Sequence, residues 1–265
     1  MEISELALRA QVAWFRGLAA SGFPQISAGE GFAVSTGLAS NTENGAVISP
    51  SVLGNLQELD VLLVWLREQA VPASVLVTGP LDPEATMHLT ERGLESERTG
   101  NNMGRPLTDL DADDDADVAG RLLPGWQISE ATDTRTLREN HRVYADDGWW
   151  DKPGELDHHI EVAARLGFGP DQPIRHWTAR HQDVPIGAAT SFQFGDAVLL
   201  AHACVAAPWR RQGIGTALTR VRLAAAVGKG AVQAVLFPSP DGYHLHHSLG
   251  FGLAPVHPDR WFYLR

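Results

Sequence analysis

Periodic apolar positions predict a mixture of helices and short strands in the first half of the chain. Apolar residues that recur three and four positions apart predict amphipathic helices over residues 7–20 and 55–69. Short apolar runs bounded by Gly, Pro, Asn or Ser predict strands. By these two criteria, strands cover residues 32–35, 46–49, 75–78 and 94–98, and a further helix covers residues 83–92.

The second half shows the same kinds of element after an acidic segment. Alternation around the turn at residues 183–185 predicts a hairpin, and an apolar run predicts a buried strand over residues 197–205. Asp133 or Thr134 is a suitable cap for a helix that runs toward Tyr144. The remaining elements are strands over 126–132, 174–181, 186–194 and 232–237, a helix over 216–227 and a short helix before Leu249.

One order of elements occurs twice along the chain. The segment WLREQAVPASVLVTGP precedes a helix that ends in ERGL, and RLAAAVGKGAVQAVLFPSP precedes a helix that ends in SLGF. We interpret this as an internal repeat, so the two halves share an α/β (α+β) architecture. The alternative is two unrelated α/β segments that use common turns.

An acidic segment separates the halves. Six aspartates lie within the nine residues 109–117, where they repel one another and offer nothing apolar to bury. We therefore expect a first domain over 1–106, a solvated linker over 107–122 and a second domain over 123–265. A metal-binding loop is the alternative, but the segment lacks the glycine and the terminal glutamate of an EF-hand.

Composition indicates a globular protein whose halves differ in charge. The 265 residues are 44% hydrophobic and 20% charged, and residues 1–122, with 18 acidic and 7 basic side chains, account for the whole net charge of −11. Neither half has the basic face that nucleic acid requires. No apolar run has the length of a membrane span, no signal peptide is evident, and the single cysteine, Cys204, has no disulfide partner. We expect a cytoplasmic monomer or homodimer with no nucleic acid or membrane partner.

Residues 201–218, AHACVAAPWRRQGIGTAL, join a strand to a helix through a glycine-bearing turn. Gly213 and Gly215 allow a ligand to approach the main chain closely. The first turn of a helix has unpaired N–H groups and the positive end of the dipole, and Arg210 and Arg211 add positive charge. The turn therefore suits a pyrophosphate, although its spacing is neither GxGxxG nor GxxxxGK[ST]. The alternative is an ordinary turn with two solvated arginines.

Residues 210–215, Arg-Arg-Gln-Gly-Ile-Gly, resemble the Arg/Gln-x-x-Gly-x-Gly/Ala acyl-CoA loop of the GCN5-related N-acetyltransferase (GNAT) family. Residues 232–251 are similar to the family's fifth strand and the helix that ends in Tyr-x-x-Leu-Gly-Phe, with His246 at the tyrosine position. The resemblance implies two GNAT-like domains in tandem, each a mixed, mostly antiparallel sheet flanked by helices and splayed between strands 4 and 5. The first domain is degenerate because it lacks the loop. Acetyl-CoA would be held by Val205, Ala206, Ala207, Arg210, Arg211, Gln212, Gly213, Ile214, Gly215, Thr216 and His246.

The resemblance also implies roles for side chains, without a metal. A main-chain N–H near Val205 would polarise the acetyl carbonyl. His246 would protonate the departing thiolate, as the family tyrosine does, with solvent or Tyr243 as the alternative, and His202 is the candidate base. Zinc binding by the histidines near His246 lacks a cysteine or a fourth ligand. The loop over 145–151 would face the acceptor through Asp147, Trp149 and Trp150, or merely cap the core.

We therefore expect direct transfer of an acetyl group from acetyl-CoA to a primary amine of a small molecule. Because histidine replaces tyrosine at position 246, an acyl-CoA decarboxylase or a CoA sensor is an alternative on the same fold. A further alternative is a regulatory binding protein that docks partners through its acidic first half. The sequence does not identify the acceptor.

Overall fold

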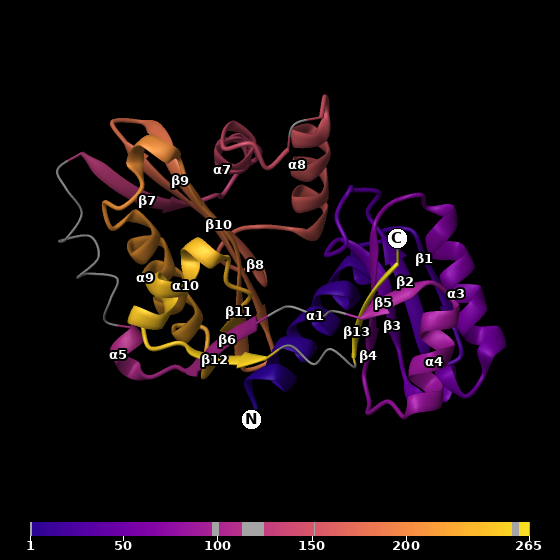
Figure 1. Cartoon of the computed structure of the whole chain (residues 1–265). Helices are drawn as coiled ribbons and strands as arrows, with labels where there is room; N and C mark the ends of the chain where they lie inside the picture. The colour runs from indigo at the N-terminus through magenta and orange to yellow at the C-terminus, as the bar shows by residue number, and fades with distance from the viewer. Residues whose placement is uncertain (1, 97–100, 113–124, 151, 256–259, 265) are drawn as a thin grey trace. The chain divides into compact units, whose positions relative to one another are not determined.

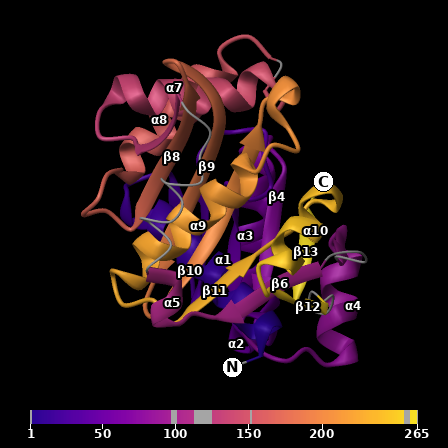
Figure 2. The same cartoon turned by 90° about the vertical axis from the view of Figure 1, so that its left-hand side faces the viewer.

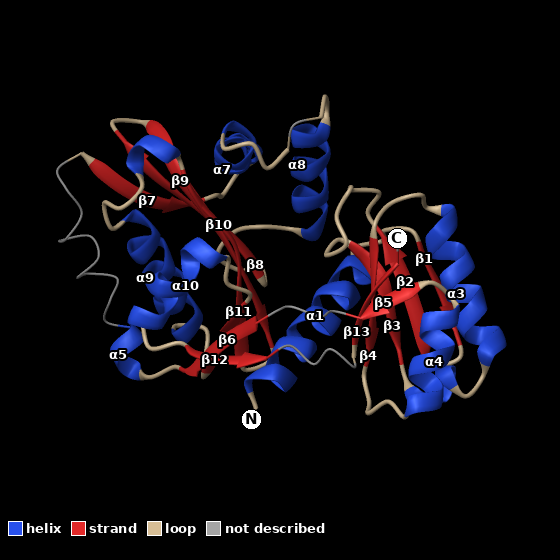
Figure 3. Cartoon of the chain, in the orientation of Figure 1, coloured by secondary structure: helices blue, strands red, loops and turns tan. Residues whose placement is uncertain are grey.

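The computed structural model describes residues 2–96, 101–112, 125–150, 152–255 and 260–264. The chain forms two compact units: unit 1 comprises Met1–Asn101 and Ala254–Arg265, and unit 2 comprises Asn102–Leu253 (Figure 1). Each unit has a sheet flanked by helices (Figure 3). Within the described ranges, no helix is long and apolar enough to cross a membrane.

The sheet of unit 1 is mixed and has the strand order β1-β2-β3-β4-β13-β5. Among its described strand pairs, β3 with β4 is the one that runs parallel. Adjacent residues of β3 face opposite helices, because Gly45 lies against Phe15 of α1 whereas Ala46 packs with Leu59 of α3. The elements are α1 (Ile3–Ala20), β1 (Gln25–Ala28), β2 (Gly31–Ser35), β3 (Asn44–Ile48), α2 (Pro50–Leu53), α3 (Leu56–Glu68), β4 (Ala73–Val77), α4 (Pro83–Glu91), β5 (Leu94–Ser96) and β13 (Trp261–Leu264).

The sheet of unit 2 has the order β12-β6-β11-β10-β9-β8-β7, and its one described parallel pair is β10 with β11. Helices cover both faces: Ala188 of β9 packs with Tyr144 of α7, whereas the next residue, Ala189, packs with Leu218 of α9. Figure 2 shows α9 along the strands. The elements are β6 (Asn101–Pro106), α5 (Asp109–Ala112), β7 (Trp126–Glu130), α7 (Thr134–Asp146), α8 (Glu155–Leu166), β8 (Ile174–His181), β9 (Val184–Phe194), β10 (Ala197–Val205), the 3₁₀ turn η1 (Ala207–Trp209), α9 (Ile214–Val227), β11 (Gln233–Leu236), α10 (Pro240–Ser248) and β12 (Gly252–Pro255).

Each sheet takes one strand from the far side of the acidic segment. β6 precedes that segment in sequence but lies between β12 and β11 in unit 2. β13, at the other end of the chain, lies between β4 and β5 in unit 1. Trp261, Phe262 and Leu264 of β13 are buried there. A single cut through the acidic segment, as the sequence suggests, would therefore remove a strand from each sheet.

The predicted fold class is confirmed, and most predicted elements match within a few residues. Asp133 caps α7 through a capping box with Thr136. The acidic segment differs from the expectation at one point: Asp111 is buried and forms an ion pair with Arg105. The predicted linker residues 113–122 lie outside the described residues.

Glu43 gives unit 1 a pH-dependent stability. Its side chain is 5% exposed, and burial raises its pKa to about 7 despite a hydrogen bond with Trp14. A raised carboxyl pKa stabilises the fold fully below the unfolded-state pKa, and that contribution disappears as pH rises toward 7. The free energy of unfolding of the wild type should therefore fall by about 2–3 kcal/mol between about pH 5 and pH 8, measured by denaturant unfolding. Glu43→Gln should not show this fall. Glu68→Gln, at an exposed position of α3, is the control; an equal effect of both variants would contradict the assignment.

Candidate active site

Helix α9 begins at Ile214, and no side chain in the described part of the chain caps its first amides. Its N-cap residue, Gly213, has a φ of 86°, and no described atom lies within 4 Å of the Cβ position that it lacks. Side-chain oxygens of Asp82, Asp133 and Ser239 cap α4, α7 and α10, whereas α1, α2, α3 and α8 also begin without such a cap. The first amides of a helix have no acceptor within the helix and lie at the positive end of its dipole. The turn predicted from the sequence therefore offers open main-chain donors to an anion.

β10 and β11 are parallel but pair only at one end. Ala197–Leu199 of β10 pair with Gln233–Val235 of β11, whereas β10 continues to Val205. Beyond Leu199, β10 has no partner strand on this side within the described chain. This is the splay between strands 4 and 5 that the resemblance implied, and it opens a main-chain edge to a ligand.

Arg210 is paired rather than free beside the glycine turn. Its Nη2 lies 2.7 Å from both carboxylate oxygens of Asp147, and its Nε donates to the carbonyl of Val205 at 2.9 Å. Cys204 donates its thiol to Asp147 at 3.2 Å, and burial together with this carboxylate raises the pKa of Cys204 to about 12. Arg210 therefore joins the end of β10 to the loop after α7. Arg211, which is exposed and has a φ of 64°, is the arginine available to an anion.

β10 carries a bulge at His202. Its pairing with β9 passes from Ala201 opposite Thr190 to Ala203 opposite Ala189, so His202 is the additional residue, with a φ of 27°. A bulge interrupts the alternation of side chains. As a result, His202 and Ala203 are both exposed. The candidate base thus lies on the accessible side of the splayed strand.

Two buried side chains hold this bulge, and the sequence analysis identified neither. Tyr144 of α7 donates its hydroxyl to the carbonyl of His202 at 3.2 Å. Arg222 of α9 donates through Nη1 to the carbonyls of Thr190 and Ala201, each at 3.0 Å. His202 keeps an accessible surface at the splay, but neighbouring protein groups displace part of the water around its ring, and this desolvation, followed by the positive charge of Arg222, places its pKa below the ordinary value. His202 is therefore neutral at pH 7 and able to accept a proton.

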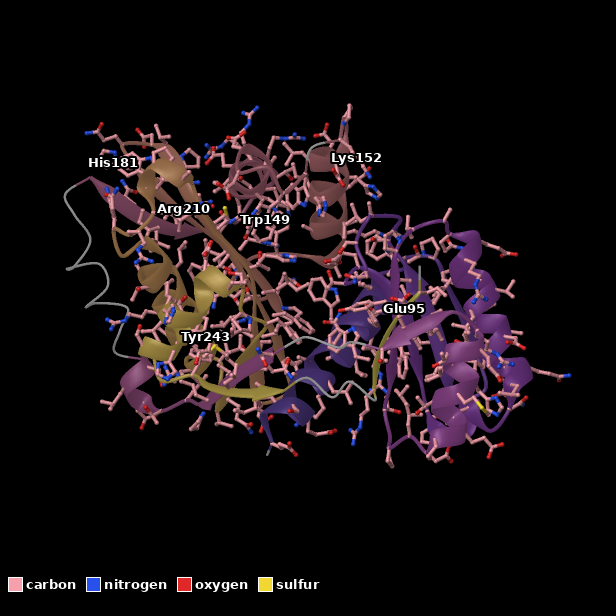
Figure 4. The ribbon with its side chains drawn as sticks, in the orientation of Figure 1. Glu95, Trp149, Lys152, His181, Arg210 and Tyr243 are labelled. Carbon is pink, nitrogen blue, oxygen red and sulfur yellow. The ribbon has the colours of Figure 1, made fainter. Side chains whose placement is uncertain are left out.

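Aromatic rings from the loop after α7 lie beside His202. The ring of Trp149 is edge-on to His202 at 6.2 Å and lies 5.1 Å from Tyr144. Trp150 stacks on His159 at 3.9 Å. Trp149 is 46% exposed, and Figure 4 shows it in the same part of unit 2 as Arg210. Of the two predicted tryptophans, Trp149 is thus available to an acceptor and Trp150 packs.

Further histidines surround the bulge without forming a metal site. Burial lowers the pKa of His159 to about 4 and that of His176 to about 3, and it places the pKa of His141 well below its ordinary value. These rings are therefore neutral at pH 7. Nowhere in the described chain are three or more His, Cys, Asp or Glu side chains arranged to hold a metal ion.

His246 and Tyr243 lie on α10 but differ in their surroundings. The ring of His246 is edge-on to Phe251 at 5.7 Å, and its buried Nδ1 has no hydrogen-bond partner within the described chain. Burial and the charge of Arg222 lower its pKa to about 4, so the cation that would protonate a thiolate is a minor species at pH 7. Tyr243 stacks on His247 at 5.8 Å and packs against the core.

Unit 1 lacks these features at the corresponding place. The parallel pairing of β3 with β4 continues to the last residues of both strands, Ile48 and Val77, so no splay forms. At the start of α3, the counterpart of α9 in the repeat, the carboxylate of Glu58 lies in the first turn and accepts a hydrogen bond from the side chain of Asn55 at 2.9 Å. A negative charge therefore lies where α9 has its glycine turn.

Comparisons with known proteins agree with this geometry. Residues 137–251 match the family model described as acetyltransferase (GNAT) family. A GCN5-related N-acetyltransferase from Kribbella flavida is similar in structure, with a TM-score of 0.61, 18% identity and coverage of 99% of this chain and 95% of that chain. A tandem GNAT protein from the clavulanic acid biosynthesis pathway has a TM-score of 0.52, 12% identity and coverage of 99% and 95%. A search of curated protein sequences gives no significant match. Residues 137–251 are therefore similar to the acetyltransferase (GNAT) family, and the chain has a fold similar to that of a GCN5-related N-acetyltransferase and of a tandem GNAT protein.

Proposed function

We propose that unit 2 is an acetyl-CoA-dependent N-acetyltransferase that transfers the acetyl group directly to a primary amine of a small molecule. The GNAT domain supports acyl transfer in general. The observation that carries the proposal is the proximity in sequence and sheet of three features: the open edge of β10, the uncapped start of α9 and the exposed, neutral His202.

The residues present suit acetyl-CoA, which supplies the acyl group. The amides from Gly213 to Thr216 and the side chain of Arg211 would bind its diphosphate. The edge of β10 beyond Leu199, which has no partner strand on that side within the described chain, would bind the extended arm. Gln212 donates its side chain to the carbonyl of Pro208 at 3.3 Å and would hold the turn in shape. The buried, unpartnered Nδ1 of His246 would find a polar partner in the ligand.

His202 would accept the proton of the attacking amine, since its ring is neutral and accessible. The exposed face of Trp149 would contact the acceptor beside it. Because His246 is neutral and Tyr243 packs against the core, the departing thiolate would take its proton from solvent.

The direct test is release of the free CoA thiol on addition of a panel of primary amines to the protein and acetyl-CoA. The proposal requires thiol release that depends on both the amine and His202. A decarboxylase would instead release carbon dioxide from a carboxylated acyl-CoA without an amine. A sensor or regulatory protein would bind CoA and release nothing.

The glycine turn should dominate cofactor affinity. Gly213→Val places a β-branched residue at a φ of 86°, and we expect CoA affinity to fall by more than about tenfold, measured by calorimetry. Arg211→Ala should cost less than this because main-chain amides remain. Arg210→Ala should mainly raise the KM for the acceptor, since its partner is Asp147. The titration should give one site per chain; undiminished affinity in Gly213→Val or two sites would contradict the assignment.

The pH dependence of turnover tests His246. Because the pKa of His246 is about 4, replacement of His246 should leave the shape of the profile of kcat against pH unchanged between about pH 6 and pH 9. His246→Gln, which retains a polar group, should also bind CoA more tightly than His246→Leu. A fall in wild-type kcat near neutral pH that disappears in His246→Gln would instead restore the role of acid implied by the family tyrosine.

A further inference from the structure

Arg222 is a buried cation without an acidic partner in the described chain. Its side chain is 1% exposed, and its partners are the carbonyls of Leu218, Thr190 and Ala201 and the hydroxyl of Thr219. Burial of a guanidinium without a carboxylate is costly, and it lowers the pKa of Arg222 to about 10. A residue that carries this cost in a core helix calls for a specific role.

The hydrogen bonds of Arg222 lie at the interruption of the β9–β10 ladder. Thr190 and Ala201 are the last paired residues before the bulge, and Nη1 of Arg222 donates to both of their carbonyls. A bulge disrupts the ladder locally, and a buried carbonyl without a donor is destabilising. Arg222 thus supplies donors from α9 at the place where the strand pairing is irregular.

We propose that Arg222 is the positioning residue of the acetyltransferase site: it locks the β10 bulge that presents His202, and it places a positive charge near the imidazole that opposes its protonation. This inference rests on the function proposed above. Tyr144 supports the same bulge from the opposite face by its bond to the carbonyl of His202.

Among the described titratable groups near His202, Arg222 is the one whose charge at neutral pH has no ion-pair partner. The pKa of Tyr144 is raised by burial, so this phenol stays protonated, and the pKa values of the neighbouring histidines are lowered. Asp147, on the loop after α7, is neutralised by Arg210. The described titratable groups near His202 are His141 and Tyr144 of α7, His159 of α8, His176 of β8 and Arg222 of α9.

The experiment measures the titration of His202 by NMR in the full chain without substrate, with the signal assigned by its loss in His202→Asn. Wild type should titrate below the ordinary value of about 6.5. Arg222→Met removes the charge and should move the midpoint toward that value, while kcat/KM falls by about 10²-fold. Arg222→Lys keeps the charge, so the midpoint should stay low although activity falls because one carbonyl loses its donor.

Leu223→Ala is the control, since Leu223 is a core residue of the same helix and its truncation destabilises without changing charge. The inference is overturned if Arg222→Met leaves the His202 midpoint unchanged, or if Leu223→Ala shifts it equally. If Arg222→Met does not fold, two other results overturn the inference. One is a titration midpoint of His202 at or above about 6.5 in the wild type, and the other is a raised midpoint in Arg222→Lys. The titration needs no activity, so its failure is distinguishable from an absence of acetyl transfer, which would refute the proposed function alone.

Discussion

Deletion of residues 256–265 is expected to unfold unit 1, although that unit is otherwise encoded at the opposite end of the chain. The deletion removes β13, which pairs with β4 on one side and β5 on the other. Trp261, Phe262 and Leu264 are buried in the sheet, and full burial of each such side chain contributes about 1.5–3 kcal/mol. The sum approaches the whole stability of a typical domain, about 5–15 kcal/mol. In the truncated chain, circular dichroism and the sensitivity of residues 2–96 to proteolysis would measure the loss of structure in unit 1.

Point variants and divided chains sharpen this prediction. Phe262→Ala should cost about 3–5 kcal/mol, whereas Leu110→Ala, at a position that is 80% exposed, should cost almost nothing. Residues 123–265 produced alone lack β6, which pairs with β11. Co-expressed chains of residues 1–112 and 123–265 restore both strands and should purify together. A stable, CoA-binding fragment of residues 123–265 alone would refute the dependence on strand exchange.

The exchange shows where sequence reasoning reached its limit for the fold. The strand over 197–205 was predicted with its observed bounds, because a long apolar run between turn signals is a local pattern. Asp133 was likewise identifiable because a cap is set by neighbouring residues. β6 and β13 are short, and their partners are fixed by long-range pairing. No local sequence pattern predicts which sheet β6 or β13 joins.

The same distinction applies to the site. The glycine turn was predicted from residue types that carry chemistry at a fixed spacing. The place of residues 145–151 beside the acceptor came from the resemblance to the family and stays a prediction. The bulge at His202 was not predicted, because an additional residue in a strand leaves no signal in an apolar run. Arg222 was missed because an arginine in a helix is ordinarily assigned to a solvated face. The electrostatics of the site thus depend on a burial that only the packed structure reveals.

His202→Asn is expected to lower kcat by about 10²–10⁴-fold, the range for loss of a positioned general base. Asparagine is the suitable replacement because it tolerates a positive φ, and the residue has a φ of 27° in the bulge. CoA affinity should change little, since the residues proposed to hold the diphosphate lie in the turn before α9. His244→Asn, at an exposed position of α10, is the matched control and should leave kcat unchanged.

The pH profile gives the second readout for His202. A base acts only in its neutral form, so kcat/KM should fall as pH decreases through the pKa of His202. Because burial and Arg222 lower that pKa, the acidic limb should lie below about 6.5, and activity should persist at pH values where an ordinary histidine is half protonated. In His202→Asn the residual activity should lose this limb, because the titrating group is gone. If the variant retains both the wild-type rate and the same acidic limb, another group accepts the proton, and His202 serves only to line the splayed edge of β10.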